Sequence, residues 1–175
     1  MPQAALPLAT RWIAAASAVV GSCVASLPAS EQHPLLGQVP PLEERPSIDG
    51  GFITLPARGH VTVMDFWATY CKPCLALMPQ YEAIWRERRD DGLVVIGVAA
   101  DDNPGLVATR LKMLGISYPN VLDDGEPSLR GTYGVLDLPR ALVFDRTGRL
   151  RLVLTGGRAE EAGKVREGVA ALLEE

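Results

Sequence analysis

The sequence predicts an α/β fold in which helices flank a central mixed β-sheet. Two nearly continuous apolar segments, 61–67 and 93–99, are separated by the helical pattern of residues 72–89. A strand, a helix and a second strand in this order are typical of a parallel βαβ unit. Two later apolar segments, 140–144 and 150–154, are joined by a short turn and predict an antiparallel hairpin. The two kinds of pairing together predict a mixed sheet.

The chain has 175 residues, of which 47% are apolar, and this is enough for one domain with a hydrophobic core. We expect that domain to span residues 48–175. The formal net charge is −4, and the basic residues are scattered, with no basic run interleaved with aromatic residues. Nucleic acid is therefore not an expected partner.

Residues 1–23 have the pattern of an export signal or a membrane anchor. Arg11 precedes a short uncharged apolar stretch whose length is typical of a secretory signal. The run Val20-Gly21-Ser22-Cys23 resembles a bacterial lipobox, so Cys23 is a candidate for lipidation. The alternatives are a signal peptide cleaved near Ser26 and an uncleaved anchor. We expect an extracytoplasmic, membrane-anchored protein.

Residues 24–47 are rich in proline, which occurs at positions 28, 34, 40, 41 and 46. Repeated proline interrupts helical and strand periods and favours an extended, semi-rigid chain. We therefore expect this segment to be a linker that holds the domain away from a membrane.

The first half of the domain is expected to build a strand and a helix around a pair of cysteines. A short apolar strand at 52–55 precedes the buried strand at 61–67. The helix that follows begins near Lys72 and ends near Asp90. Glu82 is expected on the solvated face of this helix.

The second half shows matching start and stop signals. Asn103 is a predicted cap for a helix that begins with Pro104 and ends before Gly115. A short strand at 120–122 and a short helix at 126–133 come next, before the hairpin. The last helix is expected to place four apolar residues on one stripe: Val165, Val169, Leu172 and Leu173.

Two of the three cysteines form the motif Cys71-Lys72-Pro73-Cys74, between a buried strand and a helix. A helix N-terminus offers free N–H groups and partial positive charge, which favour the thiolate form of Cys71. Cys71 is therefore the expected nucleophile, and Cys74, one turn into the helix, is the expected resolving thiol. Lys72 adds a nearby positive charge, and Pro73 restricts the backbone between the sulfurs.

Half of a zinc site and a structural disulfide are the other roles for such a motif. Zinc commonly takes four protein ligands, and the remaining candidates are Cys23, His33 and His60. A disulfide that closes so short a loop constrains the unfolded chain little. We therefore expect redox exchange with no metal and no cofactor.

Asp65 is an acidic residue inside an otherwise apolar strand. A buried carboxyl group loses hydration, which raises its pKa and lets it exchange protons near neutral pH. The alternative is an exposed Asp65 at the end of the strand. Asp65 is therefore a candidate for proton exchange near neutral pH.

The segment from Val63 to Cys74 resembles the active-site segment of the thioredoxin superfamily. Pro79 stands where these proteins kink the active-site helix, and Leu138-Pro139 resembles their cis-proline site. The stretch 93–122 resembles the extra strand and helix of the TlpA/ResA-like branch, which is exported and commonly membrane-tethered. The resemblance implies a thioredoxin fold with a β-α insertion between the CxxC helix and the cis-proline strand.

The resemblance also implies roles for individual residues. Asp65 would lie beneath Cys74 as its general acid and base, directly or through water. Pro139 would follow a cis bond, and the backbone of Leu138 would pair with the substrate like an added strand. The alternative is a trans proline at the start of an edge strand. Trp67 would pack beside the active-site helix at the substrate groove, with plain core packing as its alternative.

Two positions depart from the family pattern at the rim of that groove, which Lys72 and Pro73 are also expected to line. Tyr70 replaces the usual Trp before the first cysteine, and Arg140 replaces the usual Thr after the proline. Tyr70 still offers a flat amphipathic contact. Arg140 is expected to recognise charge or to point to solvent.

The expected activity is thiol-disulfide exchange that reduces protein disulfides outside the cytoplasm. The resemblance implies disulfide-bearing protein substrates, a membrane thiol-disulfide electron donor, and cytochrome c maturation as the usual pathway. Two alternatives share the fold: a Sco-like copper chaperone and a peroxiredoxin-like peroxidase. The first uses a wider cysteine spacing and a later histidine, whereas no histidine follows His60 here. The second uses an attacking cysteine without so close a partner.

Overall fold

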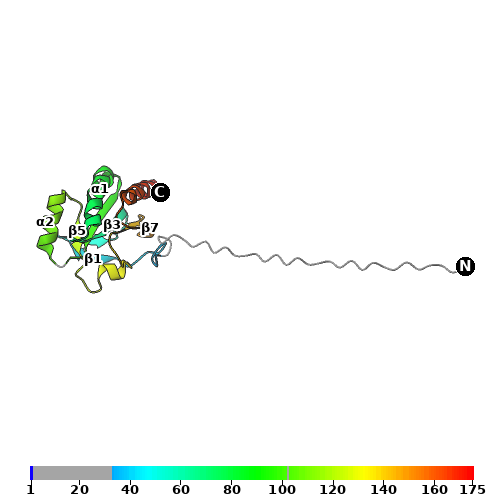
Figure 1. The fold of residues 1–175 in the computed structure, drawn as a ribbon, viewed down its shortest axis with the longest axis horizontal. Coiled ribbons are helices and arrows are strands. Elements are labelled where there is room, and N and C mark those ends of the chain that lie inside the picture. The colour runs from blue at the N-terminus through cyan, green and yellow to red at the C-terminus, as the bar shows by residue number, and fades with distance from the viewer. Residues whose placement is uncertain (2–32, 102) are drawn as a thin grey trace.

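Strand β3 (Val61–Trp67) lies at the centre of a five-stranded mixed sheet with the order β5-β4-β3-β6-β7 (Figure 1). Strands β4 (Leu93–Ala99) and β5 (Asn120–Leu122) run parallel to β3. Strand β6 (Arg140–Phe144) pairs antiparallel with β3, and β7 (Leu150–Thr155) pairs antiparallel with β6. The predicted βαβ unit, the predicted hairpin and the mixed sheet are confirmed.

The computed structural model describes residues 1, 33–101 and 103–175. The expected signal or anchor, the lipidation candidate Cys23 and the first part of the expected linker, up to residue 32, lie outside the described residues. Within the described part of the chain, no helix has both the length and the apolar character needed to cross a membrane.

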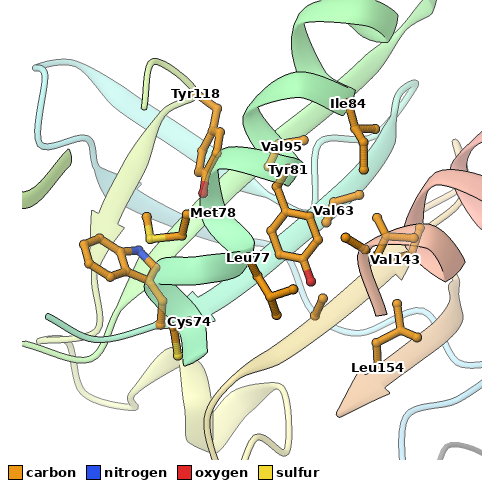
Figure 2. Packing of buried hydrophobic residues seen from close by; sticks show 14 of the residues in the cluster. Val63, Cys74, Leu77, Met78, Tyr81, Ile84, Val95, Tyr118, Val143 and Leu154 are labelled. Atoms are coloured by element: carbon orange, nitrogen blue, oxygen red, sulfur yellow. The ribbon is translucent and has the colours of Figure 1, made fainter. Parts of the chain in front are cut away.

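Every residue of β3 is buried, because both faces of the central strand are covered. On one face, Val61, Val63 and Trp67 pack with α1 (Lys72–Arg88) and α4 (Ala159–Leu173). Side chains of α1 from this core are drawn in Figure 2. On the other face, Met64 and Phe66 pack in a second core that includes Leu129 and Tyr133. Alternation along the strand therefore places Asp65 on the face that α1 covers.

The helix ends follow the expected signals. The side chain of Asn103 accepts a hydrogen bond from the Leu106 N–H (3.0 Å) at the start of α2 (Pro104–Leu114). Gly115 ends that helix with a positive φ of 67°, which glycine adopts without a steric cost. After α1, the 3-10 turn η2 (Arg89–Asp91) leads into β4.

The predicted helix at 126–133 is shorter in the structure. Helix α3 covers Leu129–Thr132, because Ser128 is its cap and accepts a hydrogen bond from the Gly131 N–H (3.0 Å). The expected stripe of α4 holds for Val165, Val169 and Leu172, which are buried, whereas Leu173 is only partly buried.

The folded domain begins earlier than the expected boundary at residue 48. Strand β1 (Glu43–Pro46) pairs antiparallel with β2 (Phe52–Leu55), although it lies in the segment expected to be a linker. Upstream of it, the Gly37 N–H donates a hydrogen bond to the Leu150 carbonyl (2.8 Å). Prolines prevent a regular period, but the residues between them still pair through their backbones. The linker interpretation is therefore wrong for these parts of residues 33–47.

Candidate active site

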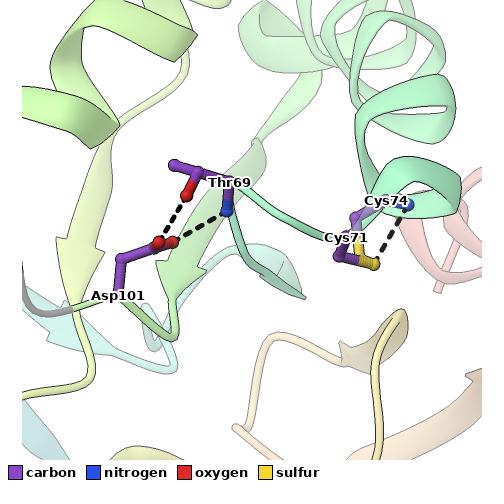
Figure 3. Close-up of a disulfide and its surroundings, with 4 residues drawn as sticks. All are labelled: Thr69, Cys71, Cys74 and Asp101. Carbon is purple, nitrogen blue, oxygen red and sulfur yellow. Dashed lines mark hydrogen bonds between the residues drawn. A yellow bond between two sulfur atoms is a disulfide. The ribbon is translucent and has the colours of Figure 1, made fainter.

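The two cysteines lie where β3 ends and α1 begins, and they are joined as a disulfide (Figure 3). The side chain of Cys74 is fully buried, whereas Cys71 keeps 9% of its surface exposed. Cys71 is therefore the more accessible of the two sulfurs, as expected from the sequence.

The backbone of the helix start is directed at Cys71. Cys71 is the cap residue of α1, and its Sγ accepts a hydrogen bond from the Cys74 N–H (3.3 Å). A thiolate at this place would gain from the same N–H group and from the helix dipole. Lys72 and Pro73 are exposed beside it, in the first turn. The arrangement favours a charged, nucleophilic sulfur at Cys71.

A side chain from the end of β4 holds the loop before the pair. The carboxylate of Asp101 accepts hydrogen bonds from the Thr69 N–H (2.8 Å) and the Thr69 hydroxyl (2.5 Å), as Figure 3 shows. The two residues are 32 positions apart. We did not expect this contact, because neither residue type marks it in the sequence.

A groove of about 560 Å³ runs beside the disulfide. Four expected groove residues line it together with Cys71: Tyr70, Lys72, Pro73 and Leu138. Three further lining residues were missed in the sequence: Arg130, Leu136 and Asp137. Exposed apolar surface on its rim comes from Tyr70 (72% exposed) and Leu136 (92% exposed). Large exposed apolar side chains beside a reactive group are typical of a contact surface for a partner.

The peptide bond between Leu138 and Pro139 is cis, in agreement with the resemblance. Pro139 itself is buried, so the half-buried Leu138 is the residue of this pair that lines the groove. Arg140 was expected to recognise charge or to point to solvent. Its side chain is only 12% exposed and forms an ion pair with Asp137 at the groove, so the solvent-pointing alternative is wrong.

Trp67 packs beside α1 as expected, but it is not among the residues that line the groove, so its expected place there is wrong. Its side chain is fully buried, and its indole N–H donates a hydrogen bond to Asn120 Oδ1 (2.9 Å). The indole faces the core because Trp67 shares the α1 face of β3 with Val63. The core alternative for Trp67 is therefore the correct one.

Asp65 is buried in the middle of the sheet, with 1% of its surface exposed, so the exposed alternative is excluded. Burial raises the pKa of this carboxyl group from 3.8 to about 7, against a lowering effect of a hydrogen bond from Tyr118. The Tyr118 hydroxyl donates that bond to Asp65 Oδ2 (3.1 Å). Asp65 can therefore gain and lose a proton near neutral pH.

Glu82 was expected on a solvated helix face, and it is instead buried between α1 and the segment before β5. Its carboxylate accepts hydrogen bonds from the backbone N–H groups of Ser117 (2.8 Å) and Tyr118 (3.2 Å) and pairs with Arg86 (2.5 Å). Burial alone would raise the pKa of Glu82, but the hydrogen bonds from Ser117 and Arg86 lower it below its ordinary value. Glu82 thus stays ionised and ties α1 to Tyr118.

Among the residues that the structure describes, no group of three or more His, Cys, Asp or Glu side chains is arranged to hold a metal ion. Of the two histidines considered as ligands, His60 is exposed and His33 is buried.

Comparison with known proteins places this site in a family. The chain matches the model of the AhpC/TSA family over residues 38–153. It is 29% identical over 104 residues to thiol-disulfide oxidoreductase ResA of Bacillus thuringiensis (strain Al Hakam), which spans 59% of this chain and 60% of that relative. It is 24% identical over 136 residues to sporulation thiol-disulfide oxidoreductase A of Bacillus subtilis (strain 168), which spans 76% of this chain and 80% of that relative.

The fold has solved counterparts as well. One is a thiol:disulfide interchange protein of the thioredoxin family from Chlorobium tepidum TLS, with a TM-score of 0.67 and 23% identity over 77% of this chain and 96% of that one. This likeness shows the thioredoxin fold that residues 63–74 and Pro139 implied. Because the family model covers more than half of the chain, the protein belongs to the AhpC/TSA family of the thioredoxin superfamily.

Proposed function

We propose that this protein is a thiol-disulfide oxidoreductase that reduces disulfides of exported protein substrates through Cys71 and Cys74. The observation that carries the proposal is the disulfide at the start of α1, with Cys71 lining a groove and Cys74 buried behind it. The two relatives above support it, because both are named thiol-disulfide oxidoreductases.

The first step begins from the reduced pair. The Cys71 thiolate attacks one sulfur of a partner disulfide, and the partner's S–S bond breaks. Cys71 is then joined to one partner sulfur, while the other leaves as a thiolate that takes a proton from water. The Cys74 N–H beside Cys71 Sγ stabilises the negative charge before the attack.

The second step resolves this mixed disulfide. The Cys74 thiol loses its proton, attacks Cys71 Sγ and releases the second partner thiolate, so two electrons have passed from the dithiol to the partner. Asp65 is the acceptor that we assign to the Cys74 proton, directly or through water. Its pKa of about 7 supports this role, because a base of that pKa is partly ionised at neutral pH and can return the proton later.

The groove is the proposed binding site for the partner. Leu138 precedes the cis proline and lines the groove, so its backbone groups are proposed to pair with an extended partner segment. Tyr70 and Leu136 would add apolar contact on the rim.

The cellular setting is proposed from the N-terminal sequence and the resemblance. Residues 1–23 would export and tether the chain, with Cys23 as the lipidation candidate. A membrane dithiol protein would return the oxidised pair to its reduced form, and cytochrome c maturation would be the pathway served. Fractionation of cells that make the full chain or its Cys23→Ser variant tests the tether, since a lipid anchor predicts release of the variant from membranes.

Electron transfer to insulin or to a disulfide peptide tests the activity itself. The reduced full chain should deliver two electrons per molecule, and the Cys71→Ser variant should deliver none. The Cys74→Ser variant should stop at a mixed disulfide that mass spectrometry detects. Cys23→Ser is the matched control and should keep full activity.

Full activity of Cys71→Ser would contradict the proposal. Rapid turnover of hydrogen peroxide without disulfide reduction would favour the peroxidase alternative instead.

A further inference from the structure

A chain of buried polar groups lies between the active-site strand and its neighbours. The Tyr118 hydroxyl donates to Asp65 Oδ2 (3.1 Å), and Asn120 Nδ2 donates to the Tyr118 carbonyl (2.9 Å). Asn120 Oδ1 in turn accepts from the Trp67 indole N–H (2.9 Å). All four residues are buried, so each of these bonds is formed away from bulk water.

The space for this chain comes from Gly97, which is the direct partner of Asp65 on strand β4. A Cβ atom at Gly97 would lie 1.8 Å from Asn120 Oδ1. The strand beside Asp65 therefore carries no side chain at this point, and the amide of Asn120 occupies that volume. Tyr118 can therefore hydrogen-bond the Asp65 side chain of β3, while Asn120 hydrogen-bonds the Trp67 side chain.

Tyr118 is fixed by hydrogen bonds to its backbone and by packing of its ring. Glu82 accepts from its N–H (3.2 Å), Asn120 donates to its carbonyl, and Trp85 packs edge-on to its ring with 6.5 Å between centroids. Figure 2 shows the ring beside α1, with the hydroxyl pointing toward Met78 and the end of the helix that carries Cys74. A side chain fixed in this way presents its hydroxyl at one position, which is typical of support around a reactive group.

We propose that Tyr118 is a positioning residue for proton transfer at Cys74: its hydroxyl holds Oδ2 of the Asp65 carboxyl group and leaves Oδ1 to exchange the proton. The inference rests on the proposed function, in which Asp65 is the proton acceptor for Cys74. Without the bond, the carboxyl group could rotate, and its ionised form would lose a donor.

The ionisable groups near the carboxyl come from two helices and from the segment before β5. Tyr118 lies before β5, Tyr81 comes from α1, and Glu161 of α4 acts on Tyr81. Burial raises the pKa of both tyrosines, so both stay protonated at neutral pH. Among the described residues, Tyr118 is the side chain that hydrogen-bonds Asp65, and Tyr81 makes no such bond.

The Tyr118→Phe variant of the full chain tests the proposal because it removes the hydroxyl and keeps the ring. A hydrogen bond to the ionised form lowers a carboxyl pKa, so the variant should raise the pKa of Asp65 further. At pH 7 less of Asp65 would then be ionised, so resolution of the mixed disulfide should slow about tenfold and recover as the pH rises. The factor of about ten corresponds to the strength of one hydrogen bond to a charged group. Rapid-quench measurements between pH 5 and 9 follow the rate, and carboxyl infrared bands follow Asp65.

Tyr81→Phe is the matched control, because it also removes a buried hydroxyl from the same core. It should show the wild-type pH profile even if it lowers the melting temperature as much as Tyr118→Phe does. Glu82→Gln weakens the hydrogen bond that the Tyr118 N–H donates to this side chain. It should therefore shift the pH profile of the resolution rate in the same direction as Tyr118→Phe. A purely structural role for Tyr118 would give equal profiles in all three variants.

An unchanged Asp65 titration in Tyr118→Phe overturns the inference. A shifted titration with an unchanged rate profile overturns it as well, because the position of Asp65 would then not matter for the step. Absence of disulfide reduction by the wild-type chain is a different result, since it removes the proposed function itself.

Discussion

Asp65 is an acidic residue in an apolar strand, and the structure buries its side chain. A carboxyl group in a central strand is costly, and the structure leaves it one neutral donor, Tyr118, and no cationic partner among its described contacts. The result is a pKa of about 7 rather than a stabilising ion pair. Such a group is kept at the expense of stability, which supports a catalytic role for it.

The Asp65→Asn variant should be more stable than the wild type at high pH. Below about pH 3 the carboxyl is protonated in both the folded and the unfolded chain, so the free energies of unfolding should be similar. Between its ordinary pKa of 3.8 and about 7, the folded chain holds a proton that the unfolded chain has lost, so wild-type stability falls as the pH rises. By pH 8 the free energy of unfolding of the variant should be higher by about 4 kcal/mol.

Urea unfolding of the oxidised proteins at pH 4, 6 and 8 measures this difference. Asp49→Asn removes an exposed carboxyl and serves as the control, with no such trend expected. A constant difference at all three pH values would show that folding does not change the pKa of Asp65.

Gly97 is a position where the close approach of the Asn120 side chain leaves no room for a Cβ atom. Gly97→Ala places a Cβ atom 1.8 Å from Asn120 Oδ1 and forces the amide out of the Trp67 and Tyr118 bonds. We expect a loss of about 1–3 kcal/mol in the free energy of unfolding, which denaturant titration measures. Gly163→Ala in α4 is the control, because no atom lies within 4 Å of its added methyl. That control should gain about 0.5–1 kcal/mol. An unchanged free energy of unfolding in Gly97→Ala would mean that the Asn120 amide can move without cost.

At the scale of elements, the start of α1 is fixed from both sides. Asp101, at the end of β4, holds Thr69 in the loop before the cysteines. Gly157, between β7 and α4, lies against Pro73, since a Cβ there would come within 2.2 Å of Pro73 Cβ. The two sulfurs are thus placed by segments that the sequence separates widely.

Gly157→Ala should disturb this placement. The new methyl would push Pro73 and the first turn of α1 outward, and small misplacements of a reacting group slow its reaction strongly. We expect roughly tenfold slower reduction of a disulfide peptide, measured by stopped-flow fluorescence. Gly163→Ala, in the adjacent helix, should react at the wild-type rate. Equal rates for the two variants would show that the first turn of α1 can shift without slowing disulfide reduction.

At the scale of the whole molecule, the segment before the expected boundary completes the domain. The Gly37 N–H donates to the Leu150 carbonyl, and β1 pairs with β2. The Tyr133 hydroxyl lies within hydrogen-bond distance of two carbonyl oxygens, those of Leu55 (2.7 Å) and Pro41 (3.2 Å). These contacts cover the sheet face opposite α1, where Tyr133 belongs to the second core. The same contacts join the upstream chain to the sheet itself.

A chain that starts at residue 48 should therefore be less stable than one that starts at residue 33. The shorter chain loses the β1 pairing and the cover over Tyr133, and we expect a loss of about 3 kcal/mol. Urea midpoints of the two oxidised chains measure the difference. Equal midpoints would mean that residues 33–47 only lie on the domain and do not stabilise it.

The sequence by itself determined the order of the elements, most of their ends and the place of the reactive pair. Apolar periods identified β3, β4 and the hairpin, and Asn103 and Gly115 marked the ends of α2. These features are local, because periodicity and capping depend on residues a few positions apart. The burial of Asp65 followed from its place in such a period.

Only the tertiary structure decided what surrounds that pair. Asp65 and Tyr118 are 53 positions apart, and Glu82 and Ser117 are 35 apart, so no local pattern announces either contact. Trp67 faces the core and Tyr70 faces the groove although they are close in sequence. Which groups touch across the sheet depends on how whole elements pack, and this also decides what surrounds Asp65 and which residues line the groove.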